Sequence, residues 1–127
     1  MIDDLEKECK TLTNVVMRSR VLTMNLIPIS PRTEQFTLDL IQNFRIQIVS
    51  ANHKWESPLI TSEGNGDIML EWLSTKRRLS IHIIAGSAVE YLKSWGFHIL
   101  DNMEDGIISD AQILPHWLWF KENYHFE

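Results

Sequence analysis

Leu79-Ser80-Ile81-His82-Ile83 carries the clearest secondary-structure pattern in this chain. Its apolar residues alternate strictly with polar ones. Because successive side chains of a strand point to opposite faces, this pattern predicts a β-strand with one buried face and one wetter face. The backbone of such a strand needs partners for its hydrogen bonds, so the flanking residues determine what kind of sheet it joins.

Three further extended segments surround that strand. They cover residues 59–62, 68–73 and 89–95, and each is bounded by turn residues. The cluster at 63–67 offers two glycines for positive φ, residues 74–78 predict a polar loop, and residues 85–87 reverse the chain again. Successive strands joined by short loops pair with their neighbours, so we expect a four-stranded antiparallel meander.

Two helices are predicted before the sheet. Over residues 3–22, apolar residues recur at spacings of three and four, which is typical of an amphipathic helix. Pro28 forbids its continuation, and Ser30, Pro31 and Glu34 then supply the N-cap, first-turn proline and acidic residue of a second helix over residues 31–46. The expected core stripe of the second helix is Phe36, Leu40, Ile41, Phe44 and Ile48.

The C-terminal part combines an acidic segment with an aromatic helix. Residues 101–110 carry four acids and no base, and we expect an acidic loop there. Trp117, Phe120, Lys121 and Tyr124 have helical spacing, and Pro115 fits only near the start of that helix. The expected fold class is therefore α+β, with two N-terminal helices, a four-stranded antiparallel meander covered on one face, and a C-terminal helix.

Composition indicates one small acidic domain. The chain has 127 residues and a net charge of −5, and we divide it into an N-terminal helix and hinge (1–27), a helix plus sheet (28–100) and the acidic, aromatic C-terminal part (101–127). Residues 64–127 carry five bases and nine acids, a balance that repels nucleic acid and favours basic partners, although it also serves solubility.

The single cysteine, Cys9, excludes an internal disulfide. An acidic N-terminus and the lack of a long apolar run predict a cytoplasmic protein without a membrane span.

The segment from Pro28 to Trp95 resembles a group of small bacterial proteins with no established activity. Their shared pattern is a Pro-Ile-Ser helix start, a tryptophan shortly before a proline where the sheet begins, and a Gly-x-Ile-x-Leu-Glu-Trp strand. These motifs stand here at residues 28–30, 55–58 and 66–72. The resemblance implies a shared fold and adds nothing about function.

A polar face of the predicted sheet is one candidate site. Glu71, His82 and Glu90 lie on neighbouring predicted strands, with Arg78 close in sequence. An acid, a histidine and an arginine on one face are the equipment of a small metal-independent ribonuclease, in which one group removes a proton and another protonates the leaving oxygen. The simpler interpretation is that these residues form cross-strand pairs on a solvent-exposed face.

No metal or cofactor is expected. Residues 101–106 resemble the start of a calcium loop, but Met103 stands where an oxygen ligand is required and Gln112 where a bidentate carboxylate is required. The histidines have no ligand spacing, and no phosphate-binding loop, dinucleotide fingerprint or nucleophile elbow occurs.

Aromatic residues suggest a second candidate site. The chain has five tryptophans, and many of its aromatics gather near the C-terminus. Core packing accounts for most of them, but an aromatic patch beside an acidic segment would also make a protein-binding surface.

The expected function is a small accessory protein, such as an inhibitor, antitoxin or immunity-type protein, acting on a basic partner. Residues 3–22 are a possible homodimer interface. The candidate partner contacts are Asp101, Glu104, Asp105, Asp110, Trp117, Trp119 and Tyr124.

Overall fold

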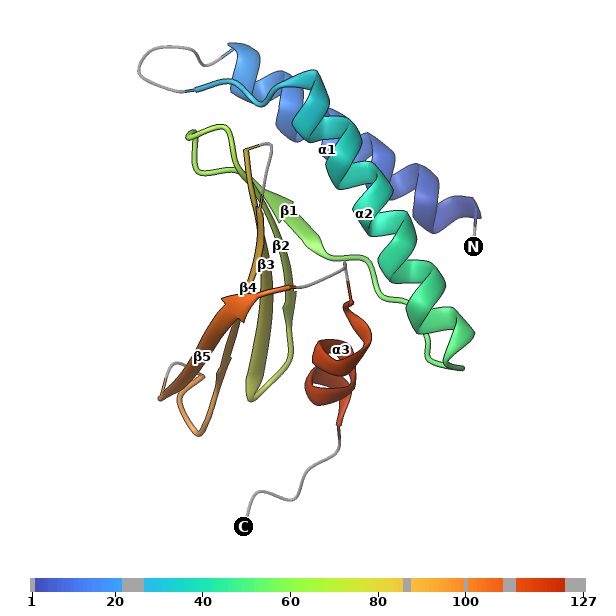
Figure 1. Cartoon of the computed structure of the whole chain (residues 1–127), viewed down its shortest axis with the longest axis vertical. Coiled ribbons are helices and arrows are strands. Elements are labelled where there is room, and N and C mark those ends of the chain that lie inside the picture. The colour runs from blue at the N-terminus through green and yellow to red at the C-terminus, as the bar shows by residue number, and fades with distance from the viewer. Residues whose placement is uncertain (1, 22–26, 86–87, 100, 109–111, 123–127) are drawn as a thin grey trace.

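The computed structural model describes residues 2–21, 27–85, 88–99, 101–108 and 112–122. Over these residues the chain forms three helices and one five-stranded sheet (Figure 1). The elements, in chain order, are α1 (Ile2–Val21), α2 (Pro31–Ser50), β1 (Leu59–Thr61), β2 (Ile68–Leu73), β3 (Arg77–Ile84), β4 (Ala88–Trp95), β5 (Asn102–Ile107) and α3 (Leu114–Lys121).

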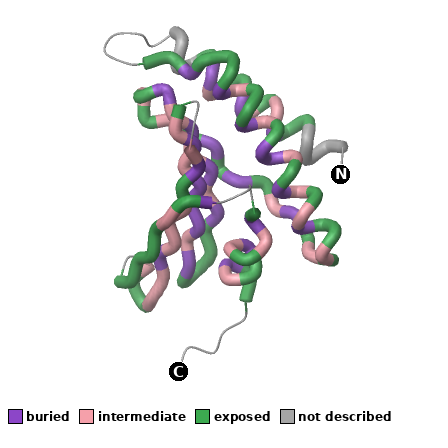
Figure 2. Tube along the Cα trace, in the orientation of Figure 1, coloured by how far each residue is buried: buried purple, intermediate pink, exposed green. Residues whose placement is uncertain are grey.

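The sheet is an antiparallel meander with the strand order β1-β2-β3-β4-β5, so the α+β class is confirmed and the number of strands is corrected from four to five. The additional strand, β5, lies where the acidic loop was predicted. Its side chains are mostly exposed, so hydrophobic periodicity could not reveal it (Figure 2). Backbone pairing with β4 forms this strand in spite of its composition.

The helices lie on one side of the sheet, and the core lies between these two layers (Figure 1). Leu79, Ile81 and Ile83 of β3 are fully buried on that inner face, as their alternation predicts. The predicted loop 74–78 is shorter than expected, because Arg77 and Arg78 already belong to β3. Arg77 points inward, where it is 3% exposed and donates a hydrogen bond to the backbone oxygen of Trp119.

The start of α2 is confirmed. The Ser30 side chain accepts a hydrogen bond from the Thr33 backbone N–H at 3.0 Å, and Pro31 lies in the first turn. The helix continues past the predicted end to Ser50. Phe36 was wrongly assigned to the core stripe, since it is 41% exposed while Thr33 and Thr37 are buried. The Thr37 hydroxyl satisfies its hydrogen-bonding potential by donating to the Thr33 carbonyl, which allows a threonine to be buried there.

Three tryptophans from distant parts of the chain form the part of the core next to α3. Trp117 of α3 stacks on Trp55 at a centroid distance of 5.9 Å and meets Trp72 of β2 edge to face at 5.5 Å. This cluster attaches α3 to the sheet, and α3 also packs against α2. Among the described residues, no helix is both long enough and apolar enough to cross a membrane.

Candidate functional site

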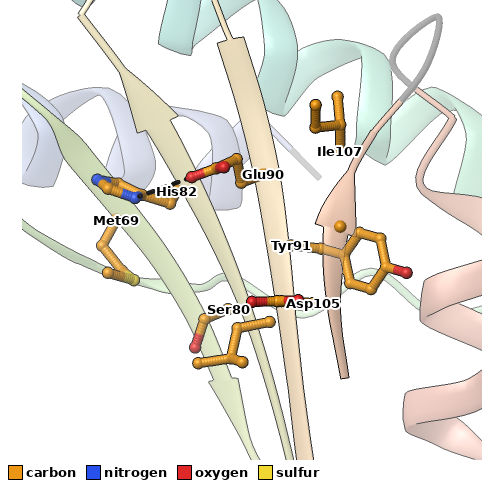
Figure 3. Close-up of a pocket in the computed structure, with 9 residues that line it drawn as sticks. Met69, Ser80, His82, Glu90, Tyr91, Asp105 and Ile107 are labelled. Carbon is orange, nitrogen blue, oxygen red and sulfur yellow. Dashed lines mark ion pairs between the residues drawn. The ribbon is translucent and has the colours of Figure 1, made fainter. Parts of the chain in front are cut away.

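The outer face of the sheet, opposite the helices, carries a hollow of about 270 Å³ (Figure 3). Four strands form its walls. The residues that line it are Met69, Ser80, His82, Glu90, Tyr91, Leu92, Asp105, Gly106 and Ile107.

Strand register explains why these side chains meet. Residues paired across neighbouring strands share a face, so each row of pairs places side chains of β2, β3, β4 and β5 side by side. The first row runs through Met69, His82, Glu90 and Ile107. The next row runs through Glu71, Ser80, Leu92 and Asp105. The hollow lies over these two rows and mixes carboxylates with apolar side chains.

His82 lies between two carboxylates. Its Nε2 is 2.9 Å from Asp67 Oδ2, and its Nδ1 is 3.8 Å from Glu90 Oε1. Asp67 also accepts a hydrogen bond from the backbone N–H of Ala85 at 2.8 Å. It therefore connects the start of β2 to the end of β3, in addition to orienting the imidazole. Asp67 was not among the predicted site residues. The available signal was its position directly after Gly66, in the turn cluster before β2, where Gly66 has a φ of +85°.

Glu71 and Arg78 form a separate pair. Glu71 Oε2 lies 3.6 Å from Arg78 Nε and accepts a hydrogen bond from the Ser80 hydroxyl at 3.1 Å. Arg78 and His82 are four positions apart on β3, which corresponds to about 13 Å along a strand. The four residues of the ribonuclease-like hypothesis therefore share the outer face, as expected, but they form two groups.

The predicted acidic partner contacts do not form one surface. Asp101 accepts the backbone N–H of His98 at 3.0 Å and so closes the turn between β4 and β5. Glu104 points to the inner face, where it accepts the Tyr91 hydroxyl at 3.1 Å and lies 3.6 Å from Lys93 Nζ. Asp105 points to the outer face and lines the hollow. Asp110 lies outside the described residues.

The predicted aromatic contacts also separate. Trp117 is fully buried in the core, so its side chain is not available to a partner. Trp119 is half-buried, packs edge to face on Trp95 at 5.8 Å and lies under Arg77. Tyr124 lies outside the described residues.

In α1, Leu12 and Val16 are buried in the core of the single chain, so this part of the predicted dimer face is already covered.

An inner-face cluster beside β5 was not predicted from the sequence. The His116 ring lies 4.3 Å from the Tyr91 ring, between α3 and β4. Burial lowers the pKa of His116 below its ordinary 6.5, and Lys93 lowers it further, while Glu104 acts in the opposite direction. Desolvation raises the pKa of Tyr91, and the hydrogen bond from its hydroxyl to the Glu104 carboxylate adds to the rise.

Within the described residues, no group of three or more His, Cys, Asp or Glu side chains could hold a metal ion. Comparisons of the chain with protein-family models, with curated proteins and with solved structures found no match. The geometry of the outer face is therefore the main guide to function.

Proposed function

We propose that this protein is a small binding accessory, of the inhibitor, antitoxin or immunity type, that holds a basic segment of a partner protein on the outer face of its sheet. The observation that carries the proposal is the pair Glu90 and Asp105, which line one hollow from neighbouring strands (Figure 3). Two carboxylates beside one hollow favour a positively charged group from outside the chain.

The local charge balance supports this proposal. Arg78 is paired with Glu71, and His82 lies closest to Asp67, so the basic groups of the outer face are largely occupied. Among the described contacts, Asp105 has no basic partner, and Glu90 has only the more distant histidine nitrogen. The chain as a whole carries a net charge of −5, which speeds association with a basic partner.

The apolar part of the hollow fits the same ligand chemistry. Met69, Leu92 and Ile107 line it together with the carboxylates. Lysine and arginine bury their aliphatic stems against apolar surface while the charged end stays close to acids or water. A hollow with both characters is therefore better suited to a lysine or arginine side chain than to a small anion.

The test is affinity capture from a lysate of the native host with matched variants. The binding variant is Glu90→Gln with Asp105→Asn. The control is Glu63→Gln with Glu122→Gln, which changes the charge equally at exposed positions outside the hollow. We expect the wild type and the control to retain the same basic protein and the binding variant to lose it. Equal capture by all three proteins would refute binding at the hollow.

A ribonuclease-like activity is the second candidate, favoured by the position of His82 between Asp67 and Glu90. A histidine held by one carboxylate can exchange a proton with a substrate. Against it, the arginine that would stabilise a phosphate is paired with Glu71, and the carboxylates of the hollow repel RNA. Hydrolysis of a fluorescent RNA by the wild type that disappears in His82→Ala would favour this second candidate over the first.

A further inference from the structure

β5 is the last strand of the sheet, and its outer edge has no strand partner within the described chain. The register identifies which backbone groups lie on that edge. The Ile108 N–H donates to the Val89 carbonyl at 2.8 Å, and hydrogen-bonded pairs alternate along antiparallel strands. Asn102, Glu104 and Gly106 therefore bond to β4. Met103, Asp105 and Ile107 direct their N–H and C=O groups away from the sheet.

The side chains of these three residues share the outer face, because they alternate with the residues opposite Tyr91 and Lys93. Met103 is 56% exposed and Ile107 is 68% exposed. Along β5, the carboxylate of Asp105 therefore stands between these two exposed apolar side chains. This part of β5 borders the hollow, since Asp105 and Ile107 line it.

A second copy of this chain pairs poorly with the acidic middle of this edge. In an antiparallel pair centred on Asp105, two aspartates would face each other directly, and in one centred on Glu104 two glutamates would do so. Like charges in directly opposed positions destabilise strand pairing. Acidic residues on an edge strand thus oppose self-association and favour a strand that carries bases.

We propose that β5 accepts an extended segment of the partner as an additional antiparallel strand, with a lysine or arginine opposite Asp105 and apolar residues two positions before and after it. This inference rests on the proposed function and specifies how the basic partner is held. In strand addition, main-chain hydrogen bonds supply affinity and alternate side chains supply specificity. A residue directly opposite Asp105 has its side chain on the outer face, where the carboxylate and the hollow lie.

The probe is a synthetic peptide with blocked ends and the sequence Thr-Ile-Thr-Lys-Thr-Ile-Thr, added to the full chain at millimolar concentration. Binding is followed by NMR as amide hydrogen exchange. We expect the peptide to slow exchange of the Met103, Asp105 and Ile107 amides, which face the free edge. The amides of Glu104 and Gly106 should change little, because they already bond to β4.

Two N-methylated peptides form the control. Methylation at the lysine nitrogen blocks a hydrogen bond to the edge and should weaken binding by about tenfold or more. Methylation of a neighbouring threonine, whose N–H faces away from β5, should leave binding nearly unchanged. A matched charge exchange completes the test: Asp105→Lys should lose the lysine peptide and bind the same peptide with glutamate in place of lysine.

The outcomes overturn strand addition alone or both proposals. Equal binding of both methylated peptides, with loss in Asp105→Asn, would overturn strand addition and keep the basic-partner proposal. Absence of any change at the β5 amides, together with unchanged lysate capture by the Glu90→Gln, Asp105→Asn variant, would overturn both. Protection of the same edge amides that depends on protein concentration without peptide would mean that a second copy occupies the edge, and would overturn strand addition by a basic partner.

Discussion

Tyr91 of β4 lies across Gly106 of β5, so close that a Cβ added at Gly106 would come within 2.8 Å of Tyr91 Cε1. The tyrosine ring cannot retreat freely, because it packs on His116 and its hydroxyl donates to Glu104. The glycine therefore allows the aromatic ring to cover the backbone of the edge strand and to connect it to α3.

The first prediction concerns this contact. Gly106→Ala should lower the free energy of unfolding by about 1–3 kcal/mol, as overpacking in an ordered region does. Urea denaturation gives the value. In a Tyr91→Ala background the same substitution should cost much less, because the obstructing ring is gone. Equal costs in both backgrounds would show that the contact does not restrict position 106.

The second prediction separates core from surface tryptophans. Trp117→Ala should lower the free energy of unfolding by about 3–5 kcal/mol, since it removes a fully buried ring that touches Trp55 and Trp72. Trp119→Ala is the matched control and should cost clearly less, because that ring is half-buried. Thermal or chemical unfolding of both variants measures the difference, and similar losses would contradict the assignment of Trp117 to the core.

The third prediction concerns a buried carboxylate. Glu8 of α1 is 2% exposed and accepts hydrogen bonds from Trp55 Nε1 at 2.5 Å and from the Ser57 hydroxyl at 2.8 Å. Glu8→Ala leaves both donors without their acceptor and should lower the free energy of unfolding by about 2–4 kcal/mol. Glu8→Gln keeps an acceptor oxygen and should cost less. If the two variants proved equally stable in denaturant titrations, these hydrogen bonds would not hold α1 in place.

The fourth prediction is a pH dependence from His116. Burial lowers its pKa below 6.5 in the folded chain, so the unfolded chain binds the proton more tightly. The contribution of His116 to stability is therefore complete above about pH 6.5 and is lost as the pH falls below that value toward the folded pKa.

This dependence is measured as the difference between the wild type and His116→Gln in urea denaturation from about pH 7.5 to about pH 5.5. The wild type should lose more stability than the variant over this range. NMR titration of the His116 ring gives the pKa directly. Parallel stability curves for the two proteins would contradict the prediction.

Local patterns predicted most of the elements correctly. The alternation of Leu79, Ile81 and Ile83 predicted β3 and its buried face, and Ser30 with Pro31 predicted the start of α2. The glycines at 64 and 66 have the positive φ that their turn cluster suggested. These signals succeed because capping, turn geometry and side-chain alternation depend on residues close together in the sequence.

The rest required contacts between distant residues. Asn102–Ile107 is too polar and too exposed to indicate a strand, and it forms one because β4 offers its backbone groups. The aromatic spacing of α3 did not show that Trp117 would be enclosed by Trp55 and Trp72. Local patterns were enough to predict the α+β class, the meander and the two faces of its strands. The fifth strand, the pairing of His82 with Asp67 and the hollow at Glu90 and Asp105 were not predictable in this way, because long-range pairing sets strand register and sheet edges.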